Sequence, residues 1–150
     1  MSVKDLLDDA KALWDSGRMN SAFALILIAF AATARLRYPK PMRDSESFKR
    51  FIRDELSTIL GTSDTSLSLP FKGPPTPVED ILYHELRCQL IHEGELPDSI
   101  VFTPKTLRDG APYDLITITD PFGMPEGWVL NMARVVMNAP ENAPLFGRNT

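Results

Sequence analysis

Apolar residues recur at helical spacing from the start of the chain. The first amphipathic set, with Asp and Lys between its members, is Val3, Leu6, Leu7, Ala10, Leu13 and Trp14. A second helix is expected from about Asn20 or Ser21 to Arg37, just before Pro39. Residues 22–32 of this helix are apolar on all sides. One buried stripe cannot account for that pattern, which predicts a helix that is central in its domain or shared between subunits.

A third amphipathic pattern begins at Asp44 and Ser45 and ends at Gly61. Residues 62–75 are rich in Ser, Thr and Pro and lack periodicity, which predicts a long surface loop. The sequence Thr76-Pro77-Val78-Glu79 then combines a capping-box pattern with proline at the first helical position. It predicts a fourth helix that runs to Gly94.

The pattern changes after the fourth helix. Ile100–Phe102 and Leu115–Ile118 are typical of two short strands, expected to pair antiparallel around a turn at Asp109-Gly110. A Pro/Gly loop is expected over Asp120–Gly127, then a closing helix over Trp128–Met137, followed by a loose tail. The predicted fold is a mainly α domain of residues 1–150, with a helical core over about 1–96, a strand pair and closing helix over about 98–138, and a tail over 139–150.

Composition narrows the class of protein. The chain has 150 residues, 43% of them apolar, which is enough for one globular domain. Cys88 is the single cysteine, so a disulfide framework is excluded and a reducing, cytoplasmic location is expected. The apolar run 22–32 is shorter than the about 20 residues that a membrane-spanning helix needs, so no membrane association is expected.

The net charge of −4 argues against binding nucleic acid by bulk charge, but the charge is unevenly distributed. Residues 35–53 hold seven basic side chains against two acidic ones, a net charge of +5, whereas the rest of the chain carries −9. The candidate phosphate contacts are Arg35, Arg37, Lys40, Arg43, Lys49, Arg50 and Arg53. Alternatively, this basic segment is a solvated helix face or docks against the acidic segment 78–98.

Three residues of metal-binding types lie at steps of four on the expected fourth helix, at His84, Cys88 and His92. The outer two would be about 12 Å apart along the helix axis, so the three cannot share one ion. Two of them could share an ion with a ligand from outside, so a metal-dependent enzyme that uses His84 or His92 stays as a third hypothesis. The leading prediction includes no metal and no cofactor.

The fourth helix also contains the string Arg87-Cys88-Gln89-Leu90-Ile91-His92 within ILYHELRCQLIHEGEL. This string resembles the signature of the HEPN superfamily of helical domains, an arginine followed after four to six residues by a histidine near the end of a late helix. The resemblance covers residues 1–96 as a helical arrangement and is sharpest over 80–96. It implies a bundle of four to five helices and a homodimeric, metal-independent endoribonuclease or RNA-binding protein, of the kind found in toxin–antitoxin or phage-defence systems with a cognate antitoxin or regulatory protein.

Cys88 stands where many HEPN members have Asn, Asp or His, and some members are inactive scaffolds. The second hypothesis is therefore a non-catalytic HEPN-like dimeric module that binds a protein partner or a nucleotide.

The residue chemistry fits RNA cleavage without metal. His92 is suited to proton transfer near neutral pH, and Arg87 to gripping a phosphate. On one straight α-helix the two side chains point about 140° apart, so a two-fold dimer would be needed to bring two sets together. The accessory candidates are His84, Tyr83, Glu93 and Cys88.

A structural alternative stays open for both catalytic candidates. Arg87 could pair with Glu85, with Asp80 or with a carboxylate of another helix, and His92 could cap the last helical turn.

Overall fold

The computed structural model describes residues 1–94, 100–117 and 121–148, and within them the chain is mainly helical with a few short strands, as the sequence predicts. The helices are α1 (Val3–Asp15), α2 (Met19–Arg37), α3 (Asp44–Asp54), α4 (Leu56–Leu60), α5 (Val78–Asp80), η1 (Ile81–Cys88), α6 (Gln89–Glu93), α7 (Glu126–Asn138) and η2 (Pro140–Phe146). The strands are β1 (Ser68–Pro70), β2 (Pro75–Pro77), β3 (Ile100–Thr103), β4 (Thr106–Arg108), β5 (Ala111–Tyr113) and β6 (Phe122–Pro125).

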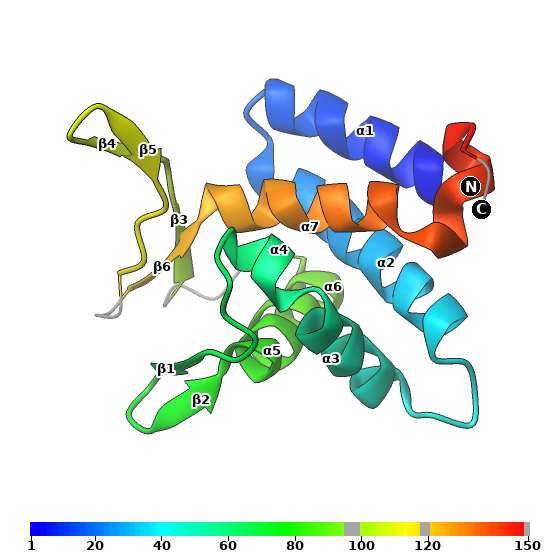
Figure 1. Ribbon diagram of the computed structural model, residues 1–150, viewed down its shortest axis with the longest axis horizontal. Helices are drawn as coiled ribbons and strands as arrows, with labels where there is room; N and C mark the ends of the chain where they lie inside the picture. Colours follow the sequence, from blue (N-terminus) through cyan, green and yellow to red (C-terminus); the bar gives the residue numbers. More distant parts are fainter. Residues whose placement is uncertain (95–99, 118–120, 149–150) are drawn as a thin grey trace.

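The apolar helix α2 is the centre of the molecule. It packs against α1, α3 and α7, and α7 crosses it in Figure 1. Its buried side chains include Phe23, Leu27 and Phe30, each fully shielded from solvent. The 19-residue helix is long and apolar enough to cross a membrane by length and composition alone, unlike its 22–32 stretch, but nearly half of its apolar window is buried in this fold. Burial in the core therefore accounts for the apolar side chains on the inner faces of α2.

The first and third expected helices form with their apolar faces inward. Helix α1 starts with a capping box in which the Ser2 side chain accepts from the Asp5 amide and the Asp5 carboxylate accepts from the Ser2 amide. The third helix is interrupted at Glu55, which separates α3 from α4, and α4 ends at Gly61 in the left-handed conformation. Phe48 and Phe51 of α3 both pack against Phe30 of α2.

The expected surface loop 62–75 contains part of a hairpin instead. Strands β1 and β2 pair antiparallel, and Leu69 and Phe71 are buried. The capping-box prediction at Thr76 is wrong because that residue belongs to β2, and its hydroxyl donates to the carbonyl of Pro74. Helix α5 begins one residue after Pro77, and the Val78 amide donates to the Leu67 carbonyl at 2.9 Å.

The strand pairing predicted near the C-terminus is also wrong. Strand β3 pairs in parallel with β6, so that Ile100 faces Phe122. The turn at Asp109-Gly110 does form, with both residues at positive φ, but it joins β4 to β5. Within the expected strand Leu115–Ile118, Thr117 makes an isolated bridge to Gly123, and Ile118 lies outside the described residues. Strand β6 contains Gly and Pro, which made it resemble a loop, yet all four of its residues are buried.

Residues 139–148 are packed rather than loose, so the predicted tail is wrong over this range. Helix η2 turns back on α2 and α7. Its Asn142 has no exposed surface, and its side-chain amide donates to the Thr33 hydroxyl and to the Val136 carbonyl, both at 2.9 Å. Thr33 in turn donates to the Ala29 carbonyl within α2. One buried polar residue thus ties the end of the chain to the central helix.

We expect Asn142→Ala to lower the free energy of unfolding by about 2 kcal/mol, because the buried Val136 carbonyl and Thr33 hydroxyl lose their donor. The matched control is Asn138→Ala at an exposed position of α7, which should change stability by less than about 0.5 kcal/mol. Urea unfolding followed by circular dichroism measures both. Equal effects of the two substitutions would contradict the packed position of η2.

Candidate functional site

The segment that carries Arg87 is a π-helix, in which backbone hydrogen bonds close on the fifth residue instead of the fourth. The expectation of one regular helix is therefore wrong over residues 81–88. Ile81 and Leu86 are separated by five residues, which is the spacing of hydrogen-bonded residues in a π-helix, and both side chains are buried. Such helices are rare, short, and often found at functional sites. The irregular segment holds four of the residues that the sequence singles out: Tyr83, His84, Arg87 and Cys88.

Arg87 is half-buried against aromatic rings. Its guanidinium carbon lies 5.8 Å from the ring centre of Phe48 and 5.3 Å from that of Tyr83. Neither carboxylate suggested as its partner pairs with it: Asp80 binds Lys49 at 2.9 Å, and Glu85 binds Lys72 at 3.1 Å. Within residues 1–94, 100–117 and 121–148, the Arg87 guanidinium has no ion pair and no hydrogen bond, so its donors are free for an anion.

His92 and Glu93 are exposed at the end of α6, before Gly94 in the left-handed conformation. The helix end is closed by the Gly94 amide, which donates to the Leu90 carbonyl at 3.1 Å. Neither side chain bonds to another part of the described chain, so the suggested capping role of His92 is absent there. Arg87 packs against Phe48 of α3, and no hydrogen bond or ion pair joins it to His92.

Lys49 of α3 packs against the α5–η1 segment. Its ammonium nitrogen lies 3.2 Å from Nε2 of His84, 2.9 Å from Asp80, and 5.6 Å from the ring centre of Tyr83. His84 also packs edge-on against Tyr83, with ring centres 5.0 Å apart. The Tyr83 ring is consequently bordered by Lys49, His84 and Arg87, and of these three Lys49 is paired with the Asp80 carboxylate. Cys88 is half-buried and unpaired.

Most of the basic segment binds carboxylates or carbonyls of this chain. Lys49 and Arg53 reach Asp80 and Glu79 of the acidic helix, which is the docked arrangement considered from the sequence. That comparison covers the acidic segment up to residue 94, since 95–98 lie outside the described residues. Arg35 donates to the Tyr38 and Met42 carbonyls and pairs with Asp44; Arg50 stacks over Tyr38, and Lys40 and Arg43 are exposed without a described partner.

Arg37 is the centre of an ion-pair network. Its guanidinium binds Glu141 of η2 at 2.8 Å, Glu55 at 3.0 Å and Asp54 at 3.4 Å, and lies over the Phe51 ring. The hydrogen bond with Glu141 raises the pKa of Arg37 above its usual range. The same bond lowers the pKa of the Glu141 carboxyl. These contacts join α2, α3 and η2. The guanidinium of Arg37 is therefore engaged in ion pairs that hold the fold together.

Sequence reasoning missed a second polar region, between α4, α7 and the β4–β5 hairpin. A cavity of about 480 Å³ is lined there by Lys105, Asp114 and Asn131 among others. Asp114 Oδ1 is buried without a hydrogen bond, 3.3 Å from the Lys105 ammonium nitrogen. This oxygen lies 2.2 Å from the position that a Cβ atom on residue 127 would occupy, so only glycine fits there. A glycine in the first turn of a helix was the one feature of the sequence that could have indicated this close approach.

Across residues 1–94, 100–117 and 121–148, no group of three or more His, Cys, Asp and Glu side chains is arranged to hold a metal ion. His84 is directed to Lys49, and His92 is at the end of the next helix, so the two histidines have separate surroundings.

The fold and this site define a mainly helical protein with a π-helix, whose arginine makes no hydrogen bond and no ion pair with the part of the chain that the structure describes. The chain belongs to the Rv1289 family, whose model matches residues 2–145. Comparisons with curated proteins and with solved structures found no match.

Glu141→Gln tests the role of the Arg37 network as a function of pH. Because Arg37 lowers the folded-state pKa of Glu141 below its unfolded value, the stabilisation is present above the unfolded pKa of about 4.3 and is lost as the pH falls through the folded pKa. We expect Glu141→Gln to destabilise by about 1–3 kcal/mol at pH 7 and much less at pH 3. Chemical unfolding at both pH values measures this.

The control is Glu93→Gln, an exposed carboxylate without a partner in the described chain, which should have little effect at either pH. A Glu141→Gln effect that is the same at pH 7 and pH 3 would show that the charge of Glu141 is not what stabilises the fold.

Proposed function

We propose that this protein is a cytoplasmic, HEPN-like homodimer that binds single-stranded RNA and cleaves it without a metal ion. The observation that supports this most is Arg87: a half-buried guanidinium, held on two aromatic rings, whose donors are free in the described structure. A structural arginine at such depth would be expected to pair with a carboxylate. A planar fork with open donors suits a phosphate.

The proposed reaction is attack of a ribose 2′-oxygen on the neighbouring phosphorus. The His92 imidazole of one subunit takes the 2′-proton, the bond from phosphorus to the 5′-oxygen breaks, and a second imidazole protonates the leaving oxygen. The products are a 2′,3′-cyclic phosphate and a free 5′-hydroxyl, so no oxidant or cofactor is needed. Arg87 stabilises the charge that develops on the phosphorane oxygens. The exposed Lys40, Arg43 and Arg50 remain available to the RNA backbone.

The second imidazole requires a second copy of the chain. The outer face of α2 leaves Ile28 42% and Leu36 59% exposed, and α6, which contacts α2, leaves Ile91 38% exposed. His92 follows Ile91 directly. A two-fold contact through this apolar face would bury these side chains and place two His92 residues near one interface.

A specific observation also supports the second candidate, a non-catalytic module that binds a partner protein such as an antitoxin. Arg35, Arg37, Lys49 and Arg53 are engaged within the chain, which reduces the charge left for RNA. Cys88 also stands next to Arg87 where many HEPN members have Asn, Asp or His. RNA binding without cleavage would favour this candidate.

The catalytic proposal is tested by Arg87→Ala and His92→Ala with single-stranded RNA in EDTA. Each substitution should reduce the cleavage rate at least about 100-fold, because each removes a group that acts in the transition state. Arg18→Ala, at an exposed arginine outside the site, is the matched control and should cleave at the wild-type rate. Gel analysis of end-labelled RNA gives the rates. Wild-type protein that does not cleave RNA, or a His92→Ala variant that still cleaves it, would refute the enzymatic proposal.

The dimer is tested by Ile28→Asp. A charge in the apolar interface should convert the dimer to a monomer, and light scattering would then report half the wild-type mass. Leu107→Asp, at a 72% exposed leucine on β4, is the matched control and should remain dimeric. A wild-type protein that is monomeric at micromolar concentration would refute the proposed interface.

A further inference from the structure

The cavity between α4, α7 and the β4–β5 hairpin contains a carboxylate whose acceptors are not all used. The Asp114 side chain is 16% exposed, and its Oδ1 is shielded from solvent without a hydrogen bond to any described residue. A buried acceptor without a donor is unfavourable, because it has given up its bonds to water. A ligand that donates to Asp114 would remove this cost.

Lys105 shows which chemical group fits at this carboxylate. Its ammonium nitrogen lies 3.3 Å from Asp114 Oδ1, close enough for an ion pair, but the contact does not provide a hydrogen bond. The lysine side chain is an alkylammonium group on a flexible methylene stem, and it is 53% exposed. A second alkylammonium group that approaches from the cavity can therefore take its place, because the Lys105 ammonium then returns to water.

A second carboxylate lines the same cavity. Asp64, in the segment after α4, is exposed and accepts a hydrogen bond from the Thr62 hydroxyl at 3.0 Å. No lysine or arginine pairs with Asp64 in the part of the chain that the structure describes. The charged residues of the lining are these two carboxylates and Lys105, a net charge of −1 that favours a cation over an anion.

The remaining lining favours an organic cation over a metal ion. Leu60, Leu67, Ile116 and Trp128 contribute apolar surface, and the half-buried Leu67 and Ile116 would lose contact with water beneath a methylene chain. Among the described residues, no three His, Cys, Asp or Glu side chains are arranged to hold a metal ion. The volume of about 480 Å³ is within the roughly 300–1,000 Å³ that is usual for small-molecule sites.

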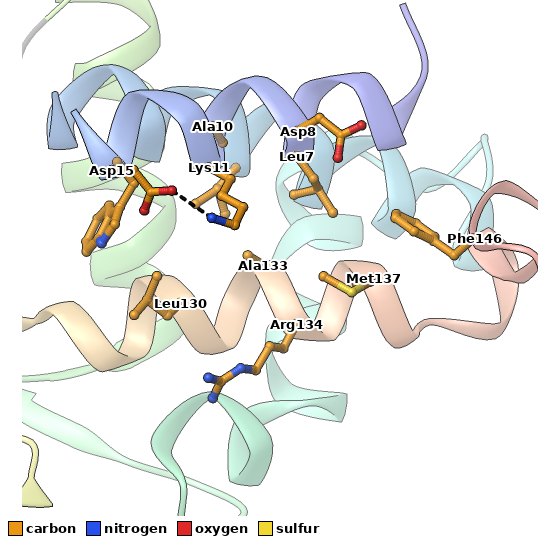
Figure 2. Close-up of a pocket in the computed structure, with 12 residues that line it drawn as sticks. Leu7, Asp8, Ala10, Lys11, Asp15, Leu130, Ala133, Arg134, Met137 and Phe146 are labelled. Atoms are coloured by element: carbon orange, nitrogen blue, oxygen red, sulfur yellow. Dashed lines mark hydrogen bonds and ion pairs between the residues drawn. The ribbon is translucent and has the colours of Figure 1, made fainter. Parts of the chain in front are cut away.

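The groove between α1 and α7 in Figure 2 lacks this combination, although its volume is similar at about 420 Å³. Its acidic residues each bind a lysine, Asp8 with Lys4 at 2.7 Å and Asp15 with Lys11 at 2.6 Å. No buried polar side-chain atom of its described lining is without a hydrogen bond. The unsatisfied carboxylate therefore distinguishes the cavity at Asp114 from this groove.

We propose that the cavity at Asp114 binds a linear aliphatic diamine, with one ammonium group at Asp114 and the other at Asp64. An ammonium group has three donors and no acceptor, so it suits a site that offers carboxylate oxygens. The methylene chain between the two ends lies against the apolar part of the lining. The cavity contains neither Arg87 nor His92, so this site is independent of the proposed RNA cleavage.

The test uses butane-1,4-diamine as the probe and the full chain, with binding followed by isothermal calorimetry at low salt. Wild type should bind one diamine per chain saturably, and butylamine at least about tenfold more weakly, because butylamine has no group for Asp64. Butylamine that binds as tightly as the diamine, or Mg²⁺ that displaces the diamine at equal concentration, would overturn the diamine assignment.

Two variants test the Asp114 end. Asp114→Asn keeps the shape of the side chain and removes its charge, so it should weaken diamine binding at least about tenfold. Lys105→Ala should strengthen binding about threefold, because the internal ammonium no longer competes for Asp114. A pair with a structural role alone would give no such gain. Asp9→Asn, at an exposed carboxylate of α1 outside the cavity, is the matched control and should bind like wild type.

Asp64→Asn tests the other end. It should weaken the diamine to the affinity of butylamine and leave butylamine unchanged. Asp64 is exposed, so this variant tests the site even where Asp114→Asn fails to fold, which a circular dichroism melt checks. The site would be overturned by a wild type without saturable binding, by folded Asp114→Asn with wild-type affinity, or by Lys105→Ala without a gain. Wild-type diamine affinity in Asp64→Asn would overturn the two-ended arrangement.

Discussion

Burial of α2 is the constraint on which the rest of the structure depends. A helix whose residues 22–32 are apolar on all sides needs neighbours on several faces, and α1, α3, α7 and η2 supply them. The C-terminal residues are part of this requirement, because Asn142 reaches Thr33 in the middle of α2. The apolar surface of α2 that remains exposed, around Ile28 and Leu36, is the one through which the proposed dimer would form.

Charge is used in this protein for assembly of the fold as much as for any ligand. Arg37 binds carboxylates from the α3–α4 junction and from η2, and it lies over Phe51. Lys49 and Arg53 do the same for α3 and the acidic α5–η1 segment. A local net charge of +5 therefore does not amount to five free cations. Arg87 differs from these residues because its contacts are aromatic and no described residue accepts a hydrogen bond from it.

Local sequence patterns predicted those helices and turns that are determined by residues close together in the chain. The periodicity of α1, the all-round apolar character of α2 and the turn at Asp109-Gly110 could be read from sequence because each has a local cause. Non-local pairing could not be read in this way. Strand β6 looked like a loop because of Gly123 and Pro125, and its partner β3 lies some twenty residues away. The same limit applies to the site: the string Arg87 to His92 singled out η1 and α6, but nothing local indicated a π-helix or Phe48 beneath the guanidinium.

The position of Arg87 is set by the core rather than by its own helix alone. Phe30 of α2 packs on Phe48 at 5.3 Å, Phe48 packs on Tyr83 at 5.6 Å, and the guanidinium rests on both Phe48 and Tyr83. This aromatic series holds the guanidinium by cation–π contacts, which do not use its N–H donors. A lysine in its place would keep the charge but lose the planar fork that suits a phosphate. The packing that buries the apolar side chains of α2 thus also positions Arg87, the guanidinium that the proposed function needs.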